Sequence, residues 1–283
     1  MYNNHSEIIK KITSELSLVD ESKYKYFNED SPILPSVESI IGMVCAIRHI
    51  MFPKYYPDRS LSSKSDAEKT NAVFCMLAEQ IERAYSQSES PADATTLAYD
   101  ILAAIPKIKE SLIKDAEAIY EGDPAATSAE EVVLSYPGFL AISVYRIAHE
   151  FYKRKIPYIS RMITEYAHER TGVDIHAGAT IGEYFFIDHG TGIVIGETTT
   201  IGDRVKIYQG VTLGAKCFEL DEHGNPIKGV KRHPDIGDDT VIYANATILG
   251  GNTRVGRGSV IGANVWITES VADGSKVFYT KGK

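Results

Sequence analysis

A six-residue repeat governs the second half of the chain. Between about residues 171 and 270, one aliphatic position returns at a step of six with few interruptions, at Ile175, Ile181, Ile187, Ile195, Ile201, Ile207, Leu213, Ile236, Ile242, Ile248, Val255, Ile261 and Ile267. A helix would place apolar residues at a period near 3.6, and a half-buried strand would alternate them, so neither explains this spacing. The step of six is typical of a parallel β-helix, in which three such units form one triangular coil and the coils stack.

A glycine often follows the aliphatic residue of this repeat. It does so at Gly182, Gly196, Gly202, Gly214, Gly237, Gly256 and Gly262. We expect the aliphatic side chain to point inward from each flat side and the glycine to accept the backbone angles of the bend. The alternative, Ile-Gly pairs scattered over an ordinary sheet, does not account for so regular a step.

The length and composition describe the class of protein. The chain has 283 residues, 43% of them hydrophobic, which at ~150 residues per domain predicts about two domains. Its net charge of −8 argues against nucleic-acid and membrane-surface partners. Cys45, Cys75 and Cys217 are odd in number and widely spaced, so they fit neither a disulfide framework nor a zinc ribbon and indicate a reducing compartment. With no apolar leader and no run of membrane-spanning length, we expect a cytoplasmic protein.

The first half of the chain carries helical patterns. The expected helices cover residues 4–19, 37–52, 66–86, 91–120, 139–153 and 158–169. The fourth helix begins at Pro91 and is expected to bend or break near Pro106. The apolar stripes of these helices are those of helix packing and subunit contact, and the stretch that begins Gly122-Asp123-Pro124 reads as a turn.

These patterns divide the chain into two predicted domains. Residues 1–170 are predicted to form an all-α domain whose apolar stripes serve helix packing and subunit contact. Residues 171–283 form a parallel β-helix of hexapeptide repeats with an inserted loop over 215–235. The predicted fold class is therefore α+β.

Two interruptions of the repeat carry titratable residues. The step widens to eight between Ile187 and Ile195, around the segment Asp188-His189-Gly190-Thr191-Gly192. The inserted loop ends in Arg232-His233-Pro234, and Asp174 lies at the start of the repeat. Because a solenoid tolerates insertions at its corners, such corners are a common place for function.

The residues at these interruptions could carry out acid–base chemistry. A histidine near neutral pKa can take a proton from an alcohol or amine, a carboxylate can fix its tautomer, and an arginine can hold a carboxylate. Asp174, either His189 or His233, and Arg232 would supply these parts, although corner histidines can also simply close loops. The sequence has no nucleophile elbow, phosphate-binding loop or dinucleotide fingerprint, which favours direct transfer to a bound acceptor.

A set of motifs resembles the serine O-acetyltransferase family. It comprises VDIHAGATIG, IDHGTGIVIGET, the long loop that closes in RHP, and IGDDTVIYANATILGG, together with the upstream Asp123-Pro124-Ala125. The resemblance covers roughly residues 120–270, and the earlier helices match only as a helical amino-terminal domain. It implies a left-handed β-helix and transfer of the acetyl group of acetyl-CoA to L-serine. The products would be O-acetyl-L-serine and CoA, in the first step of cysteine biosynthesis.

The resemblance also implies roles for individual residues. His189 would be the general base that deprotonates the serine hydroxyl, and Asp174 would orient and support it. His233 would belong to the catalytic set and, beside Arg232, would hold the serine carboxylate. The ammonium group of serine would be bound by Asp123 and Asp188.

The cofactor and partners follow from the same resemblance. Acetyl-CoA would be the co-substrate, without a metal, in a groove between subunits. The small residues expected against it are Gly214, Ala215, Ala244 and Ala263. The resemblance implies trimers or dimers of trimers, with L-cysteine as a feedback inhibitor.

Three departures from the family pattern stand out. The loop before Arg232 is longer and more charged than in many relatives, and Asn245 and Asn264 stand where small glycines are common. The chain ends in TKGK without the extended tail ending in isoleucine, so we expect no tail-mediated complex with O-acetylserine sulfhydrylase.

Three other functions remain open on the residues alone. Another hexapeptide acetyltransferase, acting on a sugar or an antibiotic, would not need the carboxylate clamp that Arg232 offers. A zinc-dependent β-helix hydratase needs three converging histidines, and His176, His189 and His233 do not show the usual H-x-x-x-x-H pair. A non-catalytic scaffold would use the corner residues only to close loops.

Overall fold

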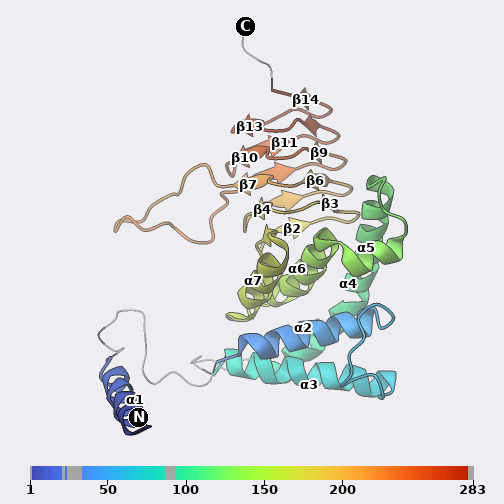
Figure 1. The fold of residues 1–283 in the computed structure, drawn as a ribbon. Helices are drawn as coiled ribbons and strands as arrows, with labels where there is room; N and C mark the ends of the chain where they lie inside the picture. Colours follow the sequence, from blue (N-terminus) through green and yellow to red (C-terminus); the bar gives the residue numbers. More distant parts are fainter. Residues whose placement is uncertain (1, 21–22, 24–33, 87–92, 280–283) are drawn as a thin grey trace.

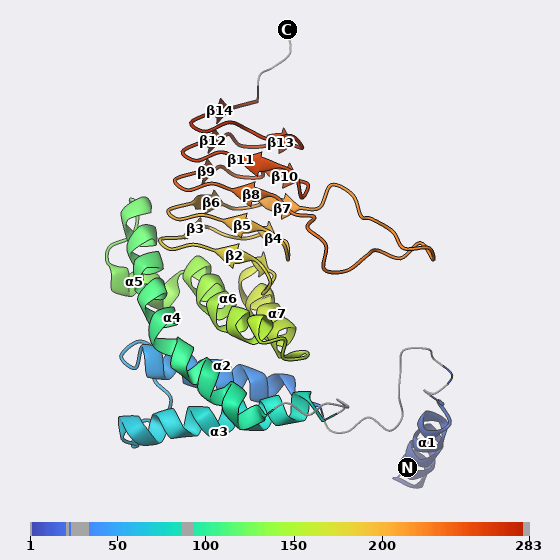
Figure 2. The same ribbon diagram turned by 180° about the vertical axis from the view of Figure 1, so that it is seen from behind.

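The computed structural model describes residues 2–20, 23, 34–86 and 93–279. Pro91 and the TKGK end lie outside these residues, so the expectations that rest on them stay predictions. The described part of the chain forms seven helices: α1 (Tyr2–Ser17), α2 (Val37–Met51), α3 (Asp66–Ala84), α4 (Ala94–Gly122), α5 (Ala129–Ser135), α6 (Pro137–Lys153) and α7 (Ile159–Thr171). Figures 1 and 2 show α2–α7 packed together beneath the β-strands, whereas α1 stands apart.

Two features of the helices differ from the sequence prediction. Helix α4 continues through Pro106 as one helix, with Ile105 and Ile108 beside the proline buried in the helical core, so the expected break does not occur and the alternative, a bend, stays a prediction. Tertiary packing there outweighs the cost of a proline inside a helix. The short helix α5 was not predicted; Ser128 caps its first turn by accepting a hydrogen bond from the backbone N–H of Glu131.

The repeat region folds into a parallel β-solenoid, as its six-residue period predicts (Figure 1). Its strands are β1 (Asp174–Ile175), β2 (Thr180–Ile181), β3 (Phe186–Asp188), β4 (Val194–Ile195), β5 (Thr200–Ile201), β6 (Lys206–Tyr208), β7 (Thr212–Gly214), β8 (Asp235–Ile236), β9 (Val241–Ile242), β10 (Thr247–Leu249), β11 (Arg254–Val255), β12 (Val260–Ile261), β13 (Trp266–Ile267) and β14 (Lys276–Val277). Equivalent repeat positions stack on one another, with Ile175 opposite Ile195 and Ile195 opposite Leu213. Strand β14 extends the solenoid beyond the predicted repeat.

The strands form three sheets, which we name by their position in the coil. Sheet A contains β1, β4, β7, β10 and β13; sheet B contains β2, β5, β8 and β11; sheet C contains β3, β6, β9, β12 and β14. The chain passes from A to B to C and back to A, so each coil has an AB, a BC and a CA corner. The inward aliphatic residues are buried, which confirms the predicted core.

The repeated glycines have a different role from the one predicted. Gly182 is not among the residues with positive φ; a Cβ at this position would lie 2.7 Å from the backbone of Gly202 in the next coil. The glycine is needed for the close approach of stacked coils, not for the bend. Side chains other than glycine take the left-handed angle at several corners, including Tyr184, Asn245 and Asn264.

A buried ion pair joins the helices to the first coil of the solenoid. The Asp115 side chain of α4 is fully buried and accepts hydrogen bonds from Nε and Nη2 of Arg146 on α6, at 2.6 and 2.9 Å. It also accepts from the N–H of Phe185 at 2.9 Å, while Arg146 Nη2 donates to the carbonyl of Gly182 at 2.7 Å. One pair of side chains therefore fixes how two helices sit against the solenoid.

We expect Arg146→Met to lower the free energy of unfolding by about 3–5 kcal/mol, because it leaves the Asp115 carboxylate buried and unpaired. Urea unfolding at fixed protein concentration measures the loss. The control is Asp115→Leu combined with Arg146→Met, which removes both charges and should recover most of the stability. An equal loss in the single and double variants would contradict this explanation.

Within the described residues, no single helix has both the length and the apolar character needed to cross a bilayer. Helices α5 and α6, bent by 73° where they meet, pass the same criteria only as a pair.

Candidate functional site

The predicted site residues gather in two groups at different corners of the solenoid. Asp188 and His189 lie at the CA corner after β3, where the end of α4 brings Asp123. Arg232 and His233 lie at the AB corner, where the inserted loop returns to β8. In Figure 1, the segments that lie next to these corners are on opposite sides of the solenoid. Helices α4 and α5 lie beside β3, and the inserted loop leaves on the other side after β7.

At the CA corner, Asp123 is held at the end of α4. Its Oδ2 accepts a hydrogen bond from the hydroxyl of Tyr136 at 2.6 Å, and its Oδ1 accepts from the N–H of Ala125 at 2.8 Å. These bonds, the Tyr136 hydroxyl first, lower the pKa of the Asp123 carboxyl. The same contact raises the pKa of Tyr136 to about 12. The pair therefore presents an ionised carboxylate beside a protonated phenol.

His189 presents its ring to solvent at this corner. The residue takes the left-handed conformation with φ 56°, and 68% of its side chain is exposed. Its backbone N–H donates to Asp188 Oδ1 at 2.7 Å, and its Nδ1 lies 3.5 Å from the same oxygen. An exposed imidazole beside two carboxylates could accept a proton from a bound hydroxyl.

Asp174 does not contact His189 within this chain. It is half-buried on β1, opposite Val194 of β4. Among the described residues, no hydrogen bond or ion pair joins it to the His189 ring, and the nearest carboxylate to that ring is Asp188. The supporting role of Asp174 therefore stays a prediction.

At the AB corner, Arg232 and His233 are held by the segment Gly196-Glu197-Thr198. Nη2 of Arg232 pairs with Oε2 of Glu197 at 2.5 Å, and the hydroxyl of Tyr152 donates to the other oxygen of Glu197 at 2.9 Å. The His233 ring is buried, with 7% of the residue exposed, and its Nδ1 faces the backbone N–H of Thr198 at 3.1 Å. Burial is the main reason that the pKa of His233 falls to about 4.

The residues expected to face CoA are also divided between corners. Ala244 and Ala263 lie at successive CA corners, where the N–H of Asn264 donates to the carbonyl of Ala244 at 3.0 Å. Gly214 ends β7 at the other edge of sheet A, and Ala215 begins the inserted loop. All four are exposed or half-buried, so they are open to a ligand.

The sequence motifs assign no role to Tyr136, Tyr152, Glu197 or Thr198. Tyr136 lies between α5 and α6, and Tyr152 belongs to α6; the apolar patterns of these helices give no sign of a polar site. For Glu197 and Thr198 the sequence does contain a signal. They occupy the AB corner one coil before the AB corner at which Arg232 lies. Stacking of equivalent corners predicts that these residues meet.

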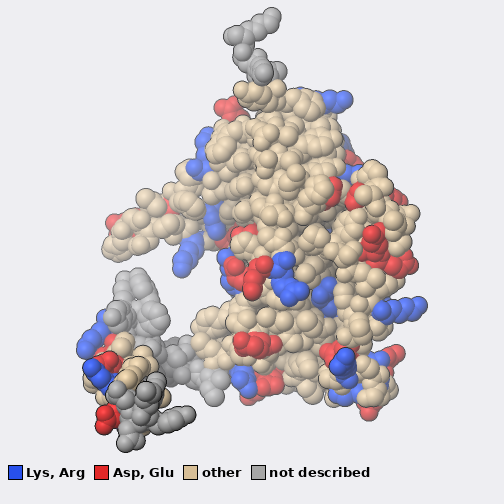
Figure 3. Space-filling model, viewed as in Figure 1, with Lys and Arg blue, Asp and Glu red and all other residues tan. Residues whose placement is uncertain are grey.

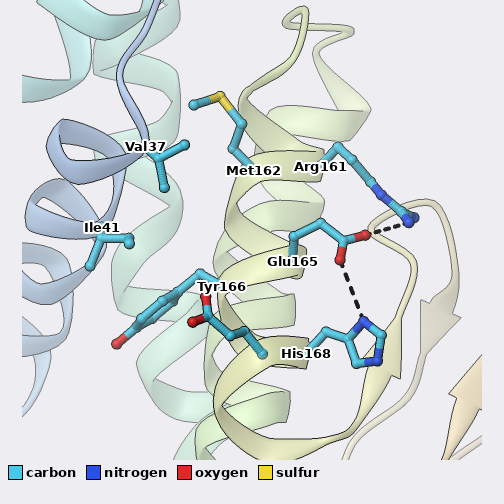
Figure 4. A pocket seen from close by; sticks show the side chains of 8 residues that line it. Val37, Ile41, Arg161, Met162, Glu165, Tyr166 and His168 are labelled. Carbon is cyan, nitrogen blue, oxygen red and sulfur yellow. Dashed lines mark hydrogen bonds and ion pairs between the residues drawn. The ribbon is translucent and has the colours of Figure 1, made fainter.

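The structure also has an apolar pocket away from these residues. It has a volume of about 460 Å³ and lies between α2 and α7. Figure 4 shows Val37, Ile41, Met162 and Tyr166 around it, with Glu165 paired to Arg161 and to His168. None of the predicted site residues lines it.

Among the described residues, no group of three His, Cys, Asp or Glu side chains is placed to hold a metal ion.

Comparison with known proteins gives consistent matches. The family model for the amino-terminal region of serine acetyltransferase matches residues 61–144. A serine acetyltransferase (plasmid) of Synechococcus elongatus is 47% identical over 258 residues, which cover 86% of this chain and 81% of that protein. The crystal structure of Entamoeba histolytica serine acetyltransferase 1 in complex with L-cysteine superposes with a TM-score of 0.74 at 36% identity, covering 94% of each chain. A serine acetyltransferase structure in complex with CoA gives a TM-score of 0.56 at 27% identity over 83% of this chain and 95% of that one.

Proposed function

The chain belongs to the serine acetyltransferase family, and from that premise we propose how its two groups of residues transfer an acetyl group from acetyl-CoA to L-serine. The proposal rests on what the two corners contain. One corner has the carboxylates of Asp123 and Asp188 beside the exposed imidazole of His189, and the other has the guanidinium of Arg232 next to the buried imidazole of His233. Together they match an acceptor that has an ammonium group, a hydroxyl and a carboxylate.

The CA corner would hold the reacting end of serine. Asp123 and Asp188 bind the ammonium group, which places the hydroxyl near the ring of His189. His189 takes the hydroxyl proton as the serine oxygen attacks the thioester carbonyl. When the tetrahedral intermediate collapses, the C–S bond breaks and His189 returns the proton to the leaving CoA sulfur. O-acetyl-L-serine and CoA are released.

The AB corner of a neighbouring copy would complete the site. Arg232 and His233 lie one side of the triangular coil away from His189 in their own chain, so we propose that they bind the serine carboxylate held by the next chain. A ring of three chains then forms three such sites. The upper solenoid face in Figure 3 carries few charged side chains, as expected of a surface that packs against another copy.

The same arrangement of chains would leave a place for acetyl-CoA. Ala244 and Ala263 on one chain, and Gly214 with Ala215 on the other, would line a groove between two solenoids where pantetheine lies against backbone. The structure of a related enzyme in complex with CoA supports this co-substrate.

We further propose L-cysteine as a competitive inhibitor. It carries the ammonium and carboxylate of serine with a thiol in place of the hydroxyl, so both charge clamps accept it. The structure of a related enzyme in complex with L-cysteine supports this.

Acceptor specificity tests the proposed function. We expect CoA release from acetyl-CoA to require L-serine. Serinol, which lacks the carboxylate, and 3-hydroxypropionate, which lacks the ammonium group, should each lower kcat/KM by at least about a hundredfold, because each loses one of the two charged contacts proposed to hold serine. Turnover with a sugar and not with serine would favour the alternative function, a hexapeptide acetyltransferase that acts on a sugar or an antibiotic.

A further inference from the structure

Three consecutive residues at the AB corner contact Arg232 and His233 in three different ways. Gly196, Glu197 and Thr198 follow β4, and the end of the inserted loop lies over them one coil later. These contacts form within a single chain and without substrate. They therefore determine what the two residues offer to a neighbouring chain before any ligand arrives.

Glu197 fixes the direction of the Arg232 side chain. Its carboxylate lies between the guanidinium of Arg232 and the hydroxyl of Tyr152, at 2.5 and 2.9 Å. About four-fifths of both charged side chains is shielded from solvent. Because Tyr152 belongs to α6, Glu197 connects the Arg232 side chain to the helical part of the chain.

Thr198 fixes the backbone and the ring of His233. Its Oγ1 accepts hydrogen bonds from the backbone N–H groups of Arg232 and His233, at 3.0 and 3.1 Å. Its own backbone N–H donates to Nδ1 of His233 at 3.1 Å, and Oγ1 lies 2.9 Å from the same nitrogen. A backbone N–H is always a donor, so Nδ1 must be the acceptor. The proton of the neutral ring then sits on Nε2.

Gly196 leaves the space that the ring needs. A Cβ at this position would lie 2.2 Å from Nε2 and 2.1 Å from Cδ2 of His233. The imidazole therefore lies across the backbone of Gly196, and a larger residue would push it away from Thr198.

The surroundings also keep the ring uncharged. The charged and titratable groups that face it are Arg232, Lys231, Glu197 and His176. Burial and the two cations lower its pKa from 6.5 to about 4, against the opposing effect of Glu197. The unfolded chain protonates His233 at a higher pH than the folded chain does. The stability of the fold therefore decreases as the pH falls from about 6.5 to about 4.

We propose that Gly196, Glu197 and Thr198 are positioning residues that present His233 as a neutral imidazole with its proton on Nε2, a hydrogen-bond donor and not a base. This inference rests on the proposed function, in which Arg232 and His233 meet the serine carboxylate. It gives His233 a different role from the acid–base one expected from the sequence, and leaves His189 to take the serine proton.

The tautomer can be observed directly. Long-range ¹H–¹⁵N correlation spectra of the whole protein with ¹⁵N-labelled histidine report which ring nitrogen carries the proton, and His233→Gln identifies the signals. We expect Nε2–H with an unprotonated Nδ1 that stays unchanged from pH 8 to about pH 5, as the depressed pKa requires. A proton on Nδ1, or titration near pH 6.5, would overturn the proposal.

Kinetics test the positioning role. Thr198→Val keeps the shape of the residue but removes the acceptor of two N–H groups, so we expect the KM for L-serine to rise about tenfold while the KM for acetyl-CoA is unchanged. Thr198→Ser keeps the hydroxyl and should stay within about twofold of wild type. Equal KM values for serine in the two variants would contradict the role of Thr198.

The two readouts separate failure of this inference from failure of the proposed function. Wild-type protein that turns over no L-serine would remove the proposed function, and the positioning proposal that rests on it would fall with it. Normal turnover of serine with His233 protonated on Nδ1 would remove only the positioning proposal.

Discussion

Replacing His189 with alanine should lower the kcat for acetyl transfer to L-serine by about 10²–10⁴-fold, the usual contribution of a general base. The expected loss is in kcat, because the exposed ring acts on the serine hydroxyl and the carboxylates that bind the ammonium group remain. The KM for acetyl-CoA should change little. Initial rates of CoA release over a range of both substrates give these constants.

The matched control for this variant is His168→Ala. His168 is also a partly exposed histidine near a carboxylate, Glu165, but it lies on α7 at the apolar pocket. We expect wild-type kinetics and an unchanged thermal unfolding midpoint. If His189→Ala also kept wild-type kcat, the general base would have to be another group, and a structural role for the corner histidine would be favoured.

The fold could be predicted because the repeat acts locally and at every coil. Three steps of six complete one turn of the triangle, so the position of Leu213 against Ile195, eighteen residues earlier, follows from the period alone. Features without a period were not predictable. The passage of α4 through Pro106 depends on burial of its neighbours, and the glycine at position 182 depends on the distance between coils.

The candidate site could be predicted only in part for a similar reason. The interruptions of the repeat mark Asp188, His189 and Arg232, and the period assigns each residue to a corner. The period gives no information about what faces a corner from outside the solenoid. Tyr136 meets Asp123 because α4 and α5 pack against each other, and no spacing in the sequence indicates that contact.

Mixing two inactive variants should restore activity if neighbouring chains share each site. In His189→Ala the CA corner has no base, and in Arg232→Ala the AB corner has no carboxylate clamp. A ring of three that contains both variants holds one interface at which an intact His189 faces an intact Arg232. We therefore expect about one third of wild-type activity per ring, since each interface in a cyclic oligomer pairs one corner of a chain with the other corner of the next.

The experiment requires co-expression of the two variants with different affinity tags and purification over both. Each variant alone, purified in the same way, should show the strongly reduced activity of its own substitution, which sets the baseline. As a control, His189→Ala co-expressed with His189→Ala,Arg232→Ala should stay at that baseline, because no chain in the mixture supplies the base. Baseline activity in the doubly tagged assemblies of the two single variants would mean that His189 and Arg232 act within one chain. In that case the inserted loop would have to carry Arg232 from the AB corner to the CA corner of its own solenoid, against the contacts with Glu197 and Thr198 that hold it in this structure.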